Sequence, residues 1–169
     1  MLATTAALME DRMTDSDVPF VDEHDVMIDA PAEVVWESLV QQVNGLFGGH
    51  LAPRYARAVG CDDQTIGGPR PLAEGSTLPG FHVETFASPS ELVLAGRHRF
   101  STYVLRFQVE AISPMRSRLH AETRAAFPGV VGGIYRLAVI GTGGHAVAVR
   151  RILTQVKRTT MRSRSAAGR

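Results

Sequence analysis

The pattern of apolar and polar positions along the chain predicts a first strand and a helix, then a series of strands and a final helix. Residues 20–29 alternate in the manner of a strand, with Val26 and Ile28 on one side. A helix follows, because Pro31 suits a first helical turn in which its missing N–H leaves no bond unmade. An apolar stripe then continues at helical spacing to a Gly48-Gly49 pair that ends the helix. The stripe consists of Val35, Trp36, Leu39, Val40, Val43, Leu46 and Phe47.

Four further strands are predicted between residues 76 and 127 from their alternation and regular spacing. They are Ser76–Ala87, Glu91–Phe100, Tyr103–Ile112 and Arg118–Phe127. The turns between them are short, and short links require antiparallel pairing because parallel strands need a long crossover. Residues 50–60 fit either a short helix or a loop, and residues 62–75 are predicted to form a weak strand with turns.

One face of these strands is apolar and the other is charged, which is typical of an antiparallel sheet with one side in water. The charged side chains of the outer face are expected to form cross-strand pairs. The alternation places on the inner face Leu92, Leu94, Gly96, His98, Phe100, Tyr103, Leu105, Phe107, Val109, Leu119, Ala121, Thr123, Ala125 and Phe127.

The last long stretch, Pro128–Thr160, is predicted as one helix on the order of 45 Å long, which needs cover on its apolar face. That face contains Val130, Ile134, Leu137, Ala138, Ala148, Ile152 and Val156. Its middle, Gly141–His145, reads GTGGH, and each glycine weakens a helix by roughly 1 kcal/mol relative to alanine. Two interpretations remain open: close packing of strands against the glycines, which we favour, or a kink that opens a cavity and presents His145.

Composition fits one domain with a sizeable core, because the chain has 169 residues and 44% of them are hydrophobic. We expect a mobile arm over residues 1–18, a single domain over 19–160 and a basic flexible tail over 161–169, with Met13 as an alternative start. No apolar run reaches the roughly 18 residues of a membrane span, and no signal-peptide pattern occurs. The single cysteine, Cys61, excludes an internal disulfide. We therefore expect a cytoplasmic protein.

The net charge of +1 is unevenly distributed. Residues 1–30 are rich in acids, whereas no acid follows Glu122 and the chain ends with many arginines. One interpretation is a basic tail for nucleic acid or anionic lipid. The other is a solvated helix end beside the first strand, where cations favour the negative pole of the helix dipole. We favour the second and expect no nucleic-acid partner, because no basic fold face or set of stacking aromatics accompanies the tail.

The order of these elements resembles the START-like, Bet v 1-like superfamily (SRPBCC), which includes polyketide cyclases. The strand–Ala-Pro–helix–Val-Trp junction at Ile28–Trp36 is the commonest sequence mark of that superfamily. Two further segments, Leu78–Ile112 and Glu122–Leu153, resemble a bacterial branch of it. The resemblance covers residues 20–158 and implies an α+β, helix-grip fold. In that fold a curved antiparallel sheet of about six to seven strands wraps around a long C-terminal helix; it carries binders, transporters and enzymes alike.

The resemblance also implies a cavity between the inner sheet face and the last helix. Polar residues of that face carry most information, since a binding pocket is mostly apolar with few converging polar groups. They are His98, Tyr103 and Thr123, with Thr85 as a further candidate. The complete set of expected lining residues is Trp36, Tyr55, Phe81, His98, Tyr103, Leu105, Phe107, Thr123, Ile134, Tyr135, Leu137, Gly141 and His145.

Three functional hypotheses follow. The first, which we favour, is a binding protein that takes an apolar or aromatic small molecule and needs no cofactor. The second is an enzyme of the cyclase, dehydratase or isomerase kind in which His98 and Tyr103 act as acid and base, a role that requires His98 to point inward. A buried, satisfied histidine and core tyrosines with their hydroxyls at the rim are the structural alternatives. The third is an interaction module that uses the basic tail.

Other chemistry has weak signals. Two His-x-Glu pairs, His82/Glu84 and His120/Glu122, suggest a metal, but no third ligand has zinc-like spacing, so we expect none. Cys61 has no neighbouring base in the sequence. No nucleophile elbow, phosphate-binding loop or dinucleotide-binding glycine motif occurs.

Overall fold

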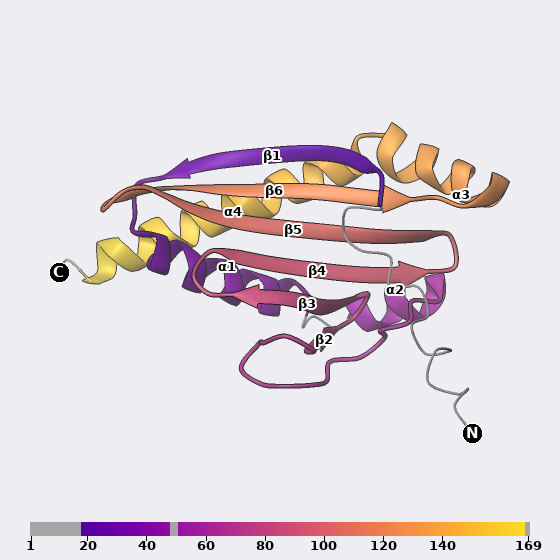
Figure 1. Ribbon diagram of the computed structural model, residues 1–169, viewed down its shortest axis with the longest axis horizontal. Coiled ribbons are helices and arrows are strands. Elements are labelled where there is room, and N and C mark those ends of the chain that lie inside the picture. The colour runs from indigo at the N-terminus through magenta and orange to yellow at the C-terminus, as the bar shows by residue number, and fades with distance from the viewer. Residues whose placement is uncertain (1–17, 48–50, 168–169) are drawn as a thin grey trace, which may run out of the picture.

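The computed structural model describes residues 18–47 and 51–167, and in these ranges a six-stranded antiparallel sheet has the order β1-β6-β5-β4-β3-β2 (Figure 1). The strands are β1 Phe20–Ile28, β2 Thr77–Leu78, β3 Phe81–Ala87, β4 Glu91–His98, β5 Ser101–Ser113 and β6 Arg116–Ala126. The helical segments are α1 Ala32–Phe47, α2 Leu51–Val59, α3 Gly129–Arg136, the π-helical η2 Leu137–Gly141 and α4 Gly144–Ala167. The predicted α+β, helix-grip architecture is confirmed.

The predicted division into an inner and an outer face is also confirmed. In the β5–β6 ladder, Phe107 lies opposite Ala121 and Val109 lies opposite Leu119. These side chains are buried against α1 and α4, which pack on the inner face of the sheet. On α1, Trp36 meets Phe86 of β3 edge-on at 5.2 Å between ring centroids. The core therefore occupies the middle of the sheet and leaves one end of its inner face to other elements.

One predicted strand differs in detail, and one alternative left open by the sequence is decided. Ser76–Ala87 is not one strand, because the chain reverses at Pro79-Gly80, where Gly80 has φ +90°, and β2 pairs antiparallel with β3. A residue other than glycine is strained in that conformation. The ambiguous stretch 50–60 contains the helix α2 over residues 51–59. The predicted end of α1 at Gly48-Gly49 lies outside the described residues.

The prediction of one continuous C-terminal helix is wrong. The helix is interrupted at Thr142-Gly143, where Gly143 has φ +73°, and α3 lies at the end of the sheet where β6 ends (Figure 1). Only the second half of the predicted apolar face, with Ile152 and Val156 of α4, packs in the core. The first half is exposed because no strand reaches it: Val130 is 82%, Ile134 63% and Leu137 70% exposed.

The ends of the domain also differ from expectation. Residues 1–17 of the predicted arm, including Met13, lie outside the described residues, whereas Val18 is buried on the outer face against Val93 and Val104. The predicted tail is helical as far as Ala167, since α4 continues through it. Arg164 donates a hydrogen bond to the carbonyl of Asp29, and α4 packs beside β1. The acidic first strand and the basic last helix are thus neighbours.

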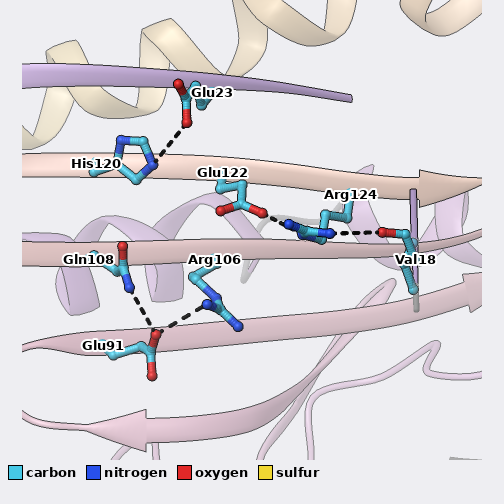
Figure 2. A network of polar contacts seen from close by, with 8 residues as sticks. All are labelled: Val18, Glu23, Glu91, Arg106, Gln108, His120, Glu122 and Arg124. Atoms are coloured by element: carbon cyan, nitrogen blue, oxygen red, sulfur yellow. Dashed lines mark hydrogen bonds and ion pairs between the residues drawn. The ribbon is translucent and has the colours of Figure 1, made fainter. Parts of the chain in front are cut away.

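Charged side chains on the outer face pair across strands, as Figure 2 shows. Glu91 lies 3.7 Å from Arg106 and accepts a hydrogen bond from Gln108 at 3.2 Å. The second His-x-Glu pair is divided between two partners. His120 lies 3.7 Å from Glu23 on β1. Glu122 instead accepts a hydrogen bond from Arg124 on the same strand, and Arg124 also donates to the carbonyl of Val18. Among the described residues, no helix has the length and apolar character required to cross a membrane.

Candidate ligand pocket

A pocket of about 270 Å³ lies at the end of the inner sheet face that α1 and the core do not fill. Strands β4, β5 and β6 form one wall, and the β2–β3 turn with α2 forms a second. The third comes from α3, η2 and the first turn of α4. The walls are mostly apolar. Of the residues predicted to line a cavity, those on the walls are Tyr55, Phe81, His98, Tyr103, Leu105, Thr123, Tyr135 and His145.

The other predicted lining residues lie elsewhere. Trp36 and Phe107 belong to the core. Ile134 and Leu137 are exposed, so they lie on the solvent side of α3 and η2. Gly141 is not on the wall either, and a Cβ placed there would touch only the side chain of Leu137. The candidate Thr85 is also absent from the wall.

His98 ends β4 and points inward, with only 8% of its surface exposed. Its Nδ1 accepts a hydrogen bond of 3.1 Å from the backbone N–H of Phe100 in the β4–β5 turn. The neutral ring therefore carries its proton on Nε2. Burial lowers the pKa of His98, so the neutral form is favoured at neutral pH. His98 is thus suited to donate one hydrogen bond to a ligand.

Tyr103 lies opposite Gly96 in the β4–β5 ladder and reaches across it. Its hydroxyl donates a hydrogen bond of 2.6 Å to the carbonyl of Gly80. The Sγ of Cys61 is 3.8 Å from the hydroxyl oxygen of Tyr103. Burial raises the pKa of Tyr103, and it also raises the pKa of the Cys61 thiol. Both groups therefore stay protonated. This fits a structural role in the pocket wall and argues against Cys61 as a thiolate nucleophile.

His98 and Tyr103 are in contact, with ring centroids 5.3 Å apart and planes inclined at 49°. The hydrogen bonds described above join each of them to a backbone group and not to one another. His98 also meets Tyr135 edge-on at 4.9 Å, and Tyr135 stacks on Phe100 at 5.5 Å. The pair therefore forms part of an aromatic wall, and the geometry shows no prepared proton transfer between them.

Two tyrosines meet at the rim of the pocket. The hydroxyl of Tyr55 on α2 is 2.9 Å from that of Tyr135 on α3, although the two residues are far apart in the sequence. Tyr55 is 58% exposed, so the bond is reached by solvent. Burial raises the pKa of Tyr135, and its contact with Tyr55 acts in the same direction. The bond joins two helices that otherwise approach the pocket from different sides.

The helix break decides between the two interpretations of Gly141–His145. A Cβ at Gly141, Gly143 or Gly144 would meet no atom of the sheet within 4 Å, so close packing against strands is wrong. The positive φ of Gly143 instead allows the chain to turn, and His145 at the start of α4 then reaches the pocket. The Nε2 of His145 lies 2.9 Å from the Oγ1 of Thr123 on β6.

Two residues of β1 lie close to His145 and were not identified as site residues from the sequence. The Oδ1 of Asp22 is 3.6 Å from the Nε2 of His145, and its Oδ2 is 3.4 Å from the Nε2 of His24. Extending the parity of Val26 and Ile28 back along β1 places both residues on the inner face, so a signal was present. Among the described residues, no group of three or more His, Cys, Asp and Glu side chains could hold a metal ion.

Comparisons with known proteins concern the fold. No family model and no curated protein sequence matches the chain. Solved structures do match it. Zhui aromatase/cyclase from Streptomyces sp. R1128 has a TM-score of 0.53 and 16% identity, over 87% of this chain and 96% of that chain. Norcoclaurine synthase from Thalictrum flavum, in complex with dopamine and hydroxybenzaldehyde, has a TM-score of 0.53 and 13% identity, over 83% and 86%.

A third similar structure, Ara h 8.0201, has a TM-score of 0.51 and 9% identity, over 83% of this chain and 96% of that chain. Similarity at such low identity concerns the backbone architecture and leaves activity open. The chain therefore has the helix-grip fold that these three structures share.

Proposed function

We propose that the protein binds a small aromatic or apolar molecule in the pocket described above. The observation that carries the proposal is the composition of the walls, which are mostly apolar and aromatic with a few convergent polar groups. Pockets of this kind gain affinity from the apolar area that a ligand buries and gain orientation from the polar groups. Here His98, Thr123 and His145 are the polar groups that supply orientation.

The size of the pocket supports a compact ligand. A dry apolar cavity of about 150 Å³ holds benzene. A pocket of about 270 Å³ therefore has room for one or two fused rings with a small substituent. The norcoclaurine synthase structure, which shares the fold, contains dopamine and hydroxybenzaldehyde, two molecules of this size class.

The other hypotheses have weaker support. An acid–base role for the pair His98 and Tyr103 lacks a hydrogen bond between the two side chains, and both donate to or accept from the backbone. For the interaction module, the basic residues as far as Ala167 belong to α4, and Arg164 is already bonded to the carbonyl of Asp29.

The test is titration with 2-methoxynaphthalene, a two-ring ligand without an acidic proton, followed by its fluorescence. The wild-type protein should bind it, and Ala125→Phe should weaken binding at least tenfold, because Ala125 lies on the wall and the new ring fills the pocket. The matched control is Ala111→Phe, which places the same ring on the exposed end of β5 and should leave binding unchanged.

Two results would reject the proposal. One is an absence of binding by the wild-type protein up to the solubility limit of the ligand. The other is equal binding by wild-type protein and Ala125→Phe, which would place the ligand elsewhere. Native mass spectrometry of freshly purified protein should in addition reveal a bound small molecule of matching size.

A further inference from the structure

The pocket has one polar end, which consists of residues from three elements. His145 of α4 lies on the wall, and Thr123 of β6 bonds to its Nε2. Asp22 of β1 lies behind them, 3.6 Å from the same nitrogen, and His24 of β1 lies 3.4 Å beyond. Asp22 is not on the wall, so of the two groups only His145 borders the space that a ligand would occupy.

Two polar atoms of this cluster are buried without a hydrogen bond. They are the Oδ1 of Asp22 and the Nε2 of His24, considering the described part of the chain. Burying a polar group without such a bond costs free energy, and native proteins keep few of them. A carboxylate in this position gains most when the neighbouring imidazole becomes positively charged, because an ion pair then replaces an uncompensated charge.

The charged and titratable groups facing His145 have opposing effects. Burial lowers the pKa of His145, the Asp22 carboxylate raises it, and His24 lowers it. Thr123, from β6, is neutral. The net effect lowers the pKa of His145, so the ring is neutral at neutral pH, and the Asp22 carboxylate is in place to stabilise its protonated form.

We propose that Asp22 and His145 form a proton-accepting pair that binds an acidic hydroxyl, phenolic or enolic, on the ligand of this pocket. The inference rests on the proposed function and specifies its ligand class. In the step, the O–H bond of the ligand breaks and an N–H bond forms on the imidazole. The electron pair remains on the ligand oxygen. The ligand is then held as an oxyanion beside an imidazolium, and the proton returns to the oxygen on release.

The nitrogen that receives the proton follows from the contacts. Nε2 already faces Thr123 and Asp22, so its hydrogen is directed toward these two oxygens. Nδ1 is consequently the nitrogen assigned to the ligand. Once protonated on both nitrogens, the ring donates through Nε2 to the β1–β6 side and through Nδ1 to the oxyanion.

The probe is 4-nitrophenol, whose absorption band shifts to longer wavelength when it ionises. The measurement is made at a pH below its pKa in water, where the free dye is neutral. Dye bound to the wild-type protein should show the phenolate band. Asp22→Asn and His145→Gln should each remove that band and shift the apparent pKa of the bound dye upward by about one unit or more. Bound dye should retain the band in the control His120→Gln, which removes a histidine of the outer sheet face beside Glu23.

Binding of 2-methoxynaphthalene, which has no proton to give, separates this inference from the proposed function. The wild type should bind it, and the far-ultraviolet circular dichroism of Asp22→Asn and His145→Gln shows that both variants are folded. If the ether binds but 4-nitrophenol binds only as the neutral phenol or not at all, the inference is overturned and the proposed function stands. If His98→Gln removes the phenolate band and His145→Gln does not, the inference is likewise overturned. If the wild type binds neither compound, both fail.

Discussion

Gly96 shows how the absence of one side chain positions another. A Cβ at this position would lie 2.5 Å from the Tyr103 ring and would also collide with the carbonyl oxygen of Gly80. The ring therefore occupies the space above Gly96, and its hydroxyl reaches Gly80. Phe81, next to Gly80, meets the same ring edge-on at 5.1 Å. This contact forms one wall of the pocket and closes the β2–β3 turn onto β5.

We expect Gly96→Ala to lower the free energy of unfolding by about 1–3 kcal/mol, since overpacking forces neighbours out of their favoured positions. Chemical denaturation measures the change. The matched control is Gly133→Ala in α3, where a Cβ would meet no atom within 4 Å. That substitution should raise stability by up to about 1 kcal/mol, because alanine favours a helix more than glycine does. Equal effects of the two substitutions would contradict the assigned role of Gly96.

At the scale of elements, α2 and α3 meet at the rim of the pocket through Tyr55 and Tyr135. Tyr135 is anchored in the aromatic wall by Phe100 and His98, whereas Tyr55 is exposed. Opening the rim therefore requires loss of one hydrogen bond and little other contact at that point. A single hydrogen bond contributes roughly 0.5–1.5 kcal/mol of net stability. That is enough to change the rate at which a ligand dissociates, but not to keep the pocket closed.

Tyr55→Phe should consequently raise the dissociation rate of 2-methoxynaphthalene about two- to tenfold, a range set by the value of one hydrogen bond. Stopped-flow fluorescence measures this rate. The free energy of unfolding should fall by no more than about 1.5 kcal/mol, because only this one hydrogen bond is lost. Tyr135→Phe removes the same bond and keeps the ring, so it should match Tyr55→Phe in the rate. A change in only one of the two variants would show that the bond does not control release.

At the scale of the whole molecule, folding buries two histidines in a neutral state. Burial lowers the pKa of both His98 and His145. The unfolded chain, in which histidine has a pKa of about 6.5, therefore binds more protons than the folded protein below that pH. The stability that these two histidines contribute is fully present above about pH 6.5. It is lost as the pH falls toward their pKa values in the folded protein.

The free energy of unfolding should accordingly decline as the pH falls below about 6.5. Urea denaturation at a series of pH values measures this slope. The double variant His98→Gln, His145→Gln should show a shallower decline, because the two groups whose pKa folding lowers are gone. His24, His82 and His120 remain in both proteins, each beside a carboxylate, and serve as a common background. Identical slopes would show that neither buried histidine is linked to folding.

Local patterns in the chain were sufficient to predict the order of the strands and helices and the two faces of the sheet. Alternation in β4, β5 and β6 reports which way each side chain points, since successive residues of a strand face opposite sides. His98, Tyr103 and Thr123 were identified as inward-facing on this basis and lie on the pocket wall. The stripe of α1 likewise places Val35 and Leu39 in the core, whereas Leu46 is exposed.

Which part of an inner face becomes core and which becomes pocket depends on the helices that cover it. Periodicity could not show that Phe107 is sealed by α1 and α4 while Leu105, two residues earlier, borders the pocket. Nor could it show that Gly143 turns the chain, because the same glycines are compatible with tight packing or a break until neighbouring atoms are placed. That turn leaves Ile134 exposed and brings His145 to Asp22, a residue more than 120 positions away in the sequence. Contacts between such distant residues arise only when the chain is packed, because local spacing carries no information about them.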